Sequence, residues 1–299
     1  LLPGLADGSH RLAFASLEPG RRYSLAPATT VAKSNAGGWQ LDGAKCVVIG
    51  APGAARLIVS ARTAGAADDA AGVSLFIVDP ATPGVSLSPS RTVDGQRCAD
   101  VTFKAVQLPA DALLGPAGGA LELIDEATDF ATALLCADAI GAMKSANDDT
   151  LEYIKTRKQF GAPIGSFQAL QHRMVEMVIV TEQARSMAIL AAAKVDTVGI
   201  DPVERRRAVS AAKVKIADAA RQVSQEAVQL HGGMGMTEEL KVSHTFRRLT
   251  MAAQRFGDAD QHLERLAALT WPTPYALRAP PQGGNASGPA EPVPRRSLG

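Results

Sequence analysis

The hydrophobic pattern of this 299-residue chain changes its period once, near residue 118. Before that point, apolar residues occur in short runs separated by turn-forming residues. After it, they recur at the three- and four-residue spacing of an amphipathic helix. A single switch of this kind indicates two successive structural parts. We therefore expect an α+β protein, with a β-rich domain over residues 1–115 and a helical domain over residues 116–271.

The β-rich half contains several short candidate strands. Residues 38–49 are typical of a hairpin with Asp42-Gly43 at the turn. Further runs of strand type occur at residues 56–62, 73–79 and 98–108. Strands this closely spaced, with Gly and Pro between them, predict a small antiparallel barrel or sandwich.

The helical half begins with a broad apolar stripe from Leu121 to Ile140. Residues 160–165 are rich in glycine and predict a loop, after which a second helix runs to about residue 198. Asp201-Pro202 has the pattern of an N-cap and an N1 proline, which opens a third helix to about residue 230. Two shorter helices are expected from about residues 237 and 258. Long helices joined by short loops predict a four-helix bundle.

The composition excludes several classes of protein. The net charge of +1 and the 4% of aromatic residues argue against a nucleic-acid-binding surface. Charge or glycine interrupts every apolar run, so no membrane span is expected. Cys46, Cys98 and Cys136 are odd in number and widely spaced, which favours reduced thiols in a cytoplasmic protein. No His or Cys spacing predicts a metal site. The tail, residues 272–299, is rich in Pro, Gly, Ser and Ala and is expected to be disordered.

Two motifs in the helical half carry the functional information. Residues 157–161 read Arg-Lys-Gln-Phe-Gly, and Gln168 follows eight residues after the Phe. Residues 229–235 read Gln-Leu-His-Gly-Gly-Met-Gly. Either motif alone is weak evidence, because glycines after a helix are usually a C-cap. Together, in this order, they resemble the middle and C-terminal domains of the acyl-CoA dehydrogenase family. The family's N-terminal helical domain is absent from this sequence.

The resemblance implies an FAD-dependent enzyme that desaturates an acyl-CoA thioester between its α- and β-carbons, with hydride transfer to FAD. An electron-transfer flavoprotein or a similar acceptor and a homo- or hetero-tetramer are also implied. In the family, the matching groups reach across a subunit interface to an FAD that the neighbouring subunit binds. The positions carried over are Arg157, Phe160, Gln168, Gln229, Gly232 and Gly233.

These residue types suit the adenosine end of a flavin cofactor. The planar fork of Arg157 can bind a pyrophosphate. Backbone amides at Gly232 and Gly233 can approach phosphate or ribose closely, since no side chain intervenes. Phe160 and Gln168 can flank an adenine by stacking and hydrogen bonding.

The sequence departs from the family where the flavin ring would be held. Residues 15–19 read Ala-Ser-Leu-Glu-Pro, so Leu17 replaces the Thr of the family's Thr-Glu-Pro segment. Residues 45–50 read Lys-Cys-Val-Val-Ile-Gly, and lack the Trp and Thr of the usual Lys-x-Trp-Ile-Thr-Asn. Leu17, Val47 and Ile49 can fill a core but cannot hydrogen-bond a flavin.

The catalytic base is also changed. The reaction needs a carboxylate beside the α-carbon, and the family's usual Glu position is occupied by Gly257. The other position that some members use is Ala131. Asp258 is the remaining local candidate, and it is also typical of an N-cap for the following helix. The two roles are not exclusive.

Groups that act across an interface are thus retained, and groups that act within one subunit are lost. This pattern resembles the small subunits of heteromeric dehydrogenases of the pimeloyl-CoA type, which act on dicarboxylyl or steroid side-chain CoA esters. A self-sufficient dehydrogenase with Asp258 as its base and a catalytically inactive structural or binding subunit remain the alternatives. His244, Arg247 and Arg248 are interpreted as a solvated basic face, or as contacts to a CoA phosphate or a neighbouring subunit.

Overall fold

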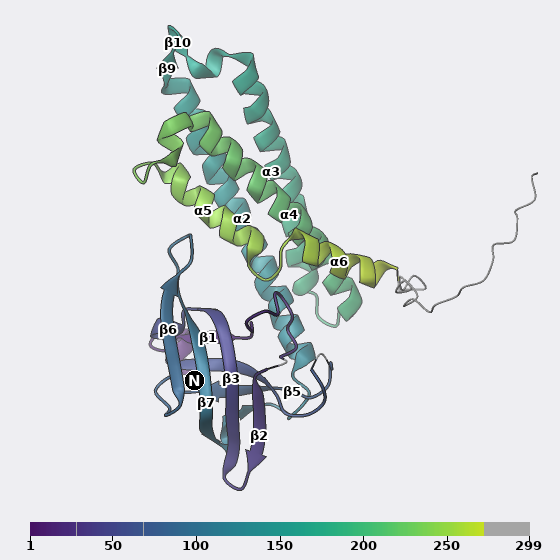
Figure 1. Cartoon of the computed structure of the whole chain (residues 1–299). Coiled ribbons are helices and arrows are strands. Elements are labelled where there is room, and N and C mark those ends of the chain that lie inside the picture. Colours follow the sequence, from purple (N-terminus) through teal and green to yellow (C-terminus); the bar gives the residue numbers. More distant parts are fainter. Residues whose placement is uncertain (28, 68, 272–299) are drawn as a thin grey trace, which may run out of the picture.

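The computed structural model describes residues 1–27, 29–67 and 69–271. A sheet and a set of long helices occupy opposite ends of the molecule, and α2 extends from the sheet into the helices (Figure 1). The predicted disordered tail, residues 272–299, lies outside the described residues. No helix in the part of the chain that the structure describes is both long and apolar enough to cross a membrane.

The main sheet has eight strands in the order β6-β7-β3-β2-β4-β5-β8, with β1 beside β4. It is a mixed sheet, because β1 pairs with β4 in parallel, whereas an antiparallel sheet was predicted. The strands are β1 (Leu12–Ala15), β2 (Val31–Asn35), β3 (Gly38–Ile49), β4 (Arg56–Arg62), β5 (Val73–Val78), β6 (Val85–Arg91), β7 (Arg97–Pro109) and β8 (Leu113–Leu114).

The predicted turn at Asp42-Gly43 is wrong, because β3 runs straight through it. Its register against β7 shifts between Leu41 and Gly43, which marks a β-bulge. The Asp42 carboxylate accepts hydrogen bonds from the backbone N–H of Ala105 at 2.7 Å and from the side chain of Gln40 at 2.8 Å. The Asp42-Gly43 pair therefore lies in a β-bulge, and the hairpin turn lies between β2 and β3 instead.

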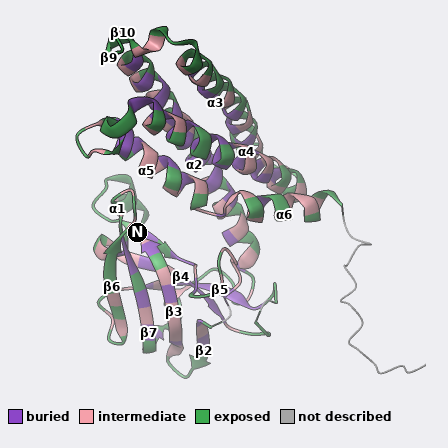
Figure 2. Cartoon of the chain, turned by 45° about the horizontal axis from the view of Figure 1, so that its top comes forward, coloured by how far each residue is buried: buried purple, intermediate pink, exposed green. Residues whose placement is uncertain are grey.

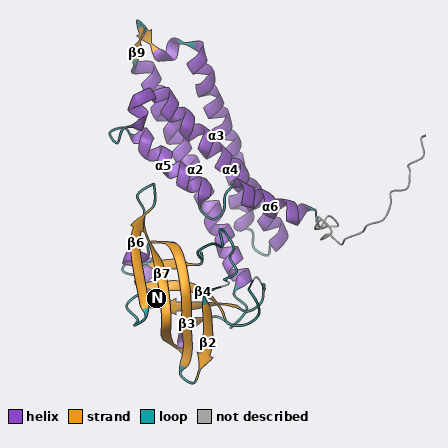
Figure 3. Cartoon of the chain, in the orientation of Figure 1, coloured by secondary structure: helices purple, strands orange, loops and turns teal. Residues whose placement is uncertain are grey.

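In the described part of the chain, five helices follow the main sheet (Figure 3). The predicted cap of α4 is confirmed, since the Asp201 side chain accepts a hydrogen bond from the N–H of Val203. The helix expected from about residue 237 begins four residues later, because residues 232–236 form the 3-10 turn η4. The five helices are α2 (Leu121–Thr156), α3 (Gln168–Val195), α4 (Pro202–His231), α5 (Lys241–Gln254) and α6 (Ala259–Thr270). The short elements are α1 (Leu2–Ala6), η1 (Ala51–Gly53), η2 (Ala110–Ala112), β9 (Lys158–Gln159), β10 (Ala162–Pro163), η3 (Ile164–Ser166) and η4 (Gly232–Met236).

The helices pack around α4, which contacts α2, α3, α5 and α6. Alanine dominates the buried core between them, so the helix backbones can approach closely. A small third cluster joins the two parts: Val73 and Leu75 of β5 pack against Ala120 and Ile124 at the start of α2. The outer side of α3 remains exposed (Figure 2).

Candidate cofactor and active site

Three of the predicted cofactor residues surround the connection between α2 and α3. Arg157 directly follows α2 as its C-cap, and its carbonyl accepts a hydrogen bond from the N–H of Ile164 at 2.8 Å. Phe160, in the tight turn between β9 and β10, has φ +54° and is 91% exposed. Its ring contacts that of Phe167 edge to face at 6.2 Å. Gln168 is the first residue of α3.

The other three lie at the end of α4. Tyr153 of α2 stacks on the His231 ring at 4.3 Å and donates a hydrogen bond to the His231 carbonyl at 3.2 Å. This contact joins the ends of α2 and α4. Gln229, Gly232 and Gly233 therefore lie at the same end of the helices as Arg157 (Figure 1). The structure brings all six predicted residues to one end of the molecule.

The arrangement at this end fits the adenosine part of FAD. The Arg157 side chain is exposed, and its guanidinium makes no hydrogen bond or ion pair to any described residue. Gly232 has φ +61°, and a Cβ at Gly232 or Gly233 would meet no atom within 4 Å, so no side chain separates this backbone from a ligand. The Gly232 N–H itself donates to the Gln229 carbonyl. An apolar hollow of about 410 Å³ lies beside this end, between α2, η3 and α3.

The predicted flavin-ring positions lie far from this end. The N–H of Cys46 donates to the carbonyl of Leu17 at 2.9 Å, so the two altered segments are neighbours. Val47 is 46% exposed, although it was expected to fill the core, and Val48 is buried instead. Leu17 and Ile49 are half-buried. None of these side chains offers a hydroxyl or an indole ring, so the chain does not fit the flavin ring here.

A buried ion pair underlies the same region and was missed from the sequence. Lys45 Nζ lies 3.1 Å from Glu18 Oε1, and their side chains are 0% and 2% exposed. Lys45 also donates to the hydroxyl of Ser60. The Glu18 carboxylate accepts from the backbone N–H groups of Thr29 and Thr30, each at 2.9 Å. The available signal was the charge of Lys45 directly beside the apolar run from Cys46 to Ile49.

Asp258 caps α6 and contacts the β-rich part. Its carboxylate accepts from the Gln261 N–H at 2.9 Å and lies 2.7 Å from Arg22 Nη2. Burial raises the pKa of Asp258, but the Gln261 N–H, the Arg22 charge and a hydrogen bond from Tyr23 outweigh it and lower the pKa overall. A general base benefits from a raised pKa. The N-cap prediction is confirmed, and the base role stays a prediction.

Gly257 is packed so that no side chain fits. It has φ +113°, and a Cβ there would lie 2.3 Å from Gln261 Oε1 and 2.7 Å from His262 Nε2. The buried His262 ring therefore lies where a side chain at position 257, the usual Glu position of the family, would extend. Ala131, the second candidate position, is half-buried on α2 and carries no acid.

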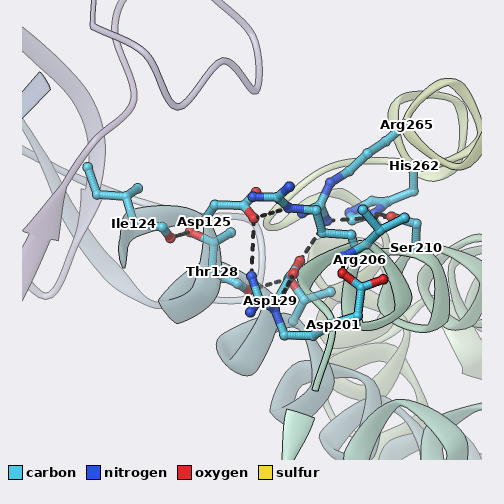
Figure 4. A network of polar contacts seen from close by, with 12 residues as sticks. Ile124, Asp125, Thr128, Asp129, Asp201, Arg206, Ser210, His262 and Arg265 are labelled. Atoms are coloured by element: carbon cyan, nitrogen blue, oxygen red, sulfur yellow. Dashed lines mark hydrogen bonds and ion pairs between the residues drawn. The ribbon is translucent and has the colours of Figure 1, made fainter. Parts of the chain in front are cut away.

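An ionic network holds α6 against α2 and α4 (Figure 4). Arg265 pairs with Asp129 at 2.6 Å and with Asp125 at 2.7 Å. Arg205 of α4 also pairs with Asp129, whose side chain is 1% exposed. Beside them, His262 bonds the hydroxyl of Ser210 at 3.3 Å. The network fixes the direction of α6, and with it the position of the 256–258 turn.

Arg247 and Arg248 were interpreted as a solvated basic face or as contacts to a CoA phosphate, and the structure shows both half-buried and in ion pairs. Arg247 pairs with Glu238. Arg248 pairs with Asp138 of α2 at 2.9 Å and with Asp94, at the tip of the β6–β7 hairpin, at 3.4 Å. Both arginines serve contacts within the chain.

The two candidate regions are separated along α2. Arg248 of α5, shortly before the 256–258 turn, lies 2.9 Å from Asp138, which places the end of α5 beside that part of α2. Arg157 lies 19 residues further along that helix, about 30 Å away at roughly 1.5 Å per residue. The flavin-ring side and the adenosine side of this chain therefore do not form one continuous site.

The described residues contain no group of three or more His, Cys, Asp or Glu side chains able to hold a metal ion. Cys46, Cys98 and Cys136 are free thiols.

Comparison with known proteins identifies both parts of the chain. The acyl-CoA dehydrogenase middle-domain family matches residues 13–106, and the acyl-CoA dehydrogenase C-terminal-domain family matches residues 121–270. Acyl-CoA dehydrogenase FadE12 of Mycobacterium tuberculosis is 32% identical over 244 residues. The match covers 81% of this chain and 62% of that relative, so the chain spans less than two thirds of the relative's length.

Solved structures agree. An acyl-CoA dehydrogenase from Geobacillus kaustophilus superposes with a TM-score of 0.83 at 27% identity, over 89% of this chain and 70% of that one. The FAD complex of PigA gives a TM-score of 0.81 at 28% identity, over 89% of this chain and 69% of that one. With both domain families and these structures in agreement, the chain belongs to the acyl-CoA dehydrogenase family.

Proposed function

We propose that this chain is one subunit of an FAD-dependent acyl-CoA dehydrogenase assembly, in which it completes a shared cofactor site. The observation that carries the proposal is the separation of two groups of residues. The Arg157 guanidinium is exposed, without a partner among the described residues, at one end of the helices, whereas Leu17 and Val47 leave the flavin-ring side without hydrogen-bonding side chains. Family membership and the FAD complex of PigA support FAD as the cofactor.

When bound, FAD accepts the hydride that leaves the β-carbon of the acyl group. The residues of this chain would hold the other end of the cofactor. Arg157 would bind the pyrophosphate by charge-assisted hydrogen bonds. Phe160 and Gln168 would contact the adenine, and Gln229 with the Gly232 and Gly233 peptide groups would contact ribose or phosphate.

A partner chain with intact Thr-Glu-Pro and Trp-Ile-Thr-Asn segments would hold the flavin ring and carry the base. The separation of about 30 Å along α2 supports sharing, since one cofactor must then be held by groups from two chains. We extend the proposal to a tetramer, an acyl-CoA thioester as substrate and an electron-transfer flavoprotein or similar acceptor that reoxidises the flavin. A cytoplasmic location is also proposed.

The same proposal includes the finer architecture. Residues 1–115 would form the β-rich middle domain as a small barrel or sandwich, and residues 116–271 the C-terminal domain with a four-helix bundle. The contacts of α2 with α3, α4 and α5 support the bundle. Limited proteolysis that cuts first near residue 115 would support this boundary.

The test is the flavin-to-protein ratio of the purified chain, alone and coexpressed with a complete acyl-CoA dehydrogenase chain. We expect little flavin on the chain alone and full loading with turnover in the mixed assembly. Arg157→Ala should lower flavin retention of the mixed assembly at least tenfold. Arg221→Ala, another exposed arginine on the helices, is the matched control and should retain flavin. Full flavin loading and turnover by the chain alone would contradict the shared site.

Two alternatives have their own outcomes. In a catalytically inactive structural or binding subunit, Arg157→Ala would leave flavin retention unchanged. In a self-sufficient dehydrogenase with Asp258 as base, Asp258→Asn would abolish turnover of the chain alone. Leu17 and Gly257 are the observations that disfavour this second alternative.

A further inference from the structure

Tyr153 of α2 contacts both of the segments that are predicted to hold the cofactor. Its backbone carbonyl accepts a hydrogen bond from the N–H of Arg157 at 2.8 Å. Its hydroxyl donates at 3.2 Å to the carbonyl of His231, the residue directly before Gly232. The second bond joins residues 78 positions apart in the chain. One half-buried tyrosine therefore links the Arg157 segment to the glycine turn, residues 232–236.

The His231 ring is restrained by two contacts. It stacks on the Tyr153 ring, with 4.3 Å between the ring centroids and 29° between the ring planes. Its Nδ1 lies 2.7 Å from the Ala227 carbonyl, so this nitrogen carries a proton and donates, because a carbonyl only accepts. His231 is buried, and its ring cannot turn without losing both contacts. The His231 carbonyl and the glycine turn that follows it are therefore fixed relative to α2.

Gly235, the last glycine of the turn, packs against His231. It is buried, and a Cβ at this position would lie 2.7 Å from the Val228 carbonyl oxygen and 3.0 Å from His231 Cβ. Gly232 and Gly233 differ, because a Cβ at either position would meet no atom within 4 Å. The glycines of the motif therefore have two roles. Gly235 lets the turn fold back onto the end of α4, and the first two leave the backbone uncovered.

The backbone of Arg157 is held on both sides, while its guanidinium has no partner among the described residues. The Arg157 N–H donates to the Tyr153 carbonyl, and the Arg157 carbonyl accepts from the Ile164 N–H, each at 2.8 Å. Gly165 lies close beneath, since a Cβ there would be 2.9 Å from the Ile154 carbonyl oxygen. Both segments thus combine a fixed backbone with exposed groups, which lowers the entropic cost of binding a ligand.

Both aromatic ring pairs of the described helical part lie at this end. One is Tyr153 with His231, and the other is Phe160 with Phe167. The buried hydrophobic core between the described helices consists of Ala, Val, Leu, Ile, Met and Cys side chains. Packing of this core does not require a tyrosine hydroxyl. The hydrogen-bonded ring stack is therefore a feature of the end where the two cofactor segments meet.

We propose that Tyr153 is a positioning residue for the cofactor. It fixes the Arg157 guanidinium and the Gly232–Gly233 backbone relative to each other, so that both bind one ADP group at the same time. Tyr153 acts through Arg157 and His231, and it need not contact the ligand. The identity of the ligand as the ADP half of FAD rests on the proposed function, whereas the link between the two segments rests on the contacts of Tyr153 alone.

The first test measures amide hydrogen exchange of the full chain without flavin. We expect Tyr153→Phe, which keeps the ring stack, to speed exchange at residues 229–237 about fivefold, and Tyr153→Leu to speed it about twentyfold. Exchange in the middle of α4 and α5 should not change. Thr181→Val removes another hydrogen bond between two helices and is the matched control, which should keep the wild-type rate at residues 229–237.

Two outcomes of the exchange experiment would overturn the link. One is an unchanged rate at residues 229–237 in Tyr153→Phe. The other is a rate that rises equally along the whole chain, since that would show general destabilisation. If Tyr153→Leu does not fold, Tyr153→Phe decides alone, because it removes only the hydroxyl.

The second test measures the dissociation constant of FAD for the mixed assembly. We expect Tyr153→Phe to raise it about fivefold and Thr181→Val to leave it unchanged. The double variant Tyr153→Phe with Arg157→Ala should bind FAD about as well as Arg157→Ala alone, because the position of an absent guanidinium no longer matters.

The double variant separates a positioning role from a purely structural one. If the two single effects multiply, Tyr153 acts independently of Arg157 and the proposal is overturned. An FAD affinity of Tyr153→Phe equal to that of the wild type would overturn it as well. If Arg157→Ala alone has no effect on FAD, the proposed shared site fails, while the exchange experiment still decides whether Tyr153 holds the glycine turn.

Discussion

Asp258 and Arg22 join the two parts of the molecule through an ion pair of 2.7 Å between Oδ2 and Nη2. The same carboxylate caps α6 through the Gln261 N–H. We expect Asp258→Ala to lower the free energy of unfolding by about 1 kcal/mol, the usual loss for an N-cap, and Asp258→Asn to cost less, because Asn also caps. Urea denaturation at pH 7 measures both.

The pKa of Asp258 gives this prediction a pH dependence. The pKa is lower in the folded protein than its ordinary value of 3.8. The folded state therefore binds fewer protons than the unfolded state as the pH falls through this range. The stabilisation from Asp258 is present above about pH 4 and is lost on acidification, so the difference in the free energy of unfolding between wild type and Asp258→Ala should shrink at pH 3.

A separate experiment tests Asp258 as a catalytic base. If Asp258→Asn leaves the turnover of the mixed assembly unchanged, the base role is excluded.

We expect His262 to cause a second pH dependence of the stability. Burial is the main cause that lowers its pKa from 6.5 to about 4, with Lys213 and Arg265 adding to it and Asp258 and the Phe256 carbonyl opposing it. The unfolded state takes up a proton below pH 6.5 that the folded state refuses until about pH 4. Stability should therefore fall by about 3 kcal/mol as the pH drops through this window. His262→Gln should flatten this part of the stability curve, whereas the exposed His172→Gln should not.

Gly257 predicts a steric effect. We expect Gly257→Ala to destabilise the protein by about 2 kcal/mol, because alanine is strained at φ +113° and its Cβ would meet His262. Gly141 on α2 is the matched control, since a Cβ there meets no atom within 4 Å. Gly141→Ala should stabilise the helix by roughly 0.5–1 kcal/mol. Thermal melts compare the two variants, and an equal response would contradict the packing argument. For the same steric reason, Gly257→Glu should not restore a catalytic base.

We expect substitutions of Lys45 and Glu18 to be strongly coupled in their effect on the free energy of unfolding. Lys45→Met leaves a buried, uncompensated carboxylate and should cost about 3 kcal/mol, and Glu18→Gln should cost a similar amount by stranding the ammonium group. The double variant removes both charges, so its loss should be smaller than the sum of the two single losses. A double-mutant cycle in urea gives the coupling energy. Additive losses would show that the two charges act independently.

The sequence predicted the features that depend on local periodicity and capping. The change of period near residue 118, the Asp201 cap and the Asp258 cap are all confirmed, because each follows from a few neighbouring residues. The loop at residues 160–165 appears in the structure as a short hairpin and a 3-10 turn. The Asp42-Gly43 turn is wrong because the pairing of β3 with β7 overrode the local turn signal.

Contacts between distant segments were not accessible from sequence spacing. The Asp129–Arg265 pair joins residues 136 positions apart, and the Lys45–Glu18 pair is 27 apart. The pairs of Arg248 with Asp94 and Asp138 likewise join segments that are far apart in the chain. The site residues from Arg157 to Gly233 could be named from the resemblance, but their meeting at one end follows from the up-and-down course of α2, α3 and α4 (Figure 1).

The separation along α2 between the region around Leu17 and the region around Arg157 has a consequence for the symmetry of the proposed assembly. A pair of identical, complete subunits related by a two-fold axis forms two equivalent interfacial sites. Pairing this chain with a complete partner breaks that equivalence. One site joins the partner's flavin-ring groups to Arg157, and the other joins the ring side around Leu17 to the partner's arginine. Only the first is whole, so the proposed assembly would carry one flavin for every two chains.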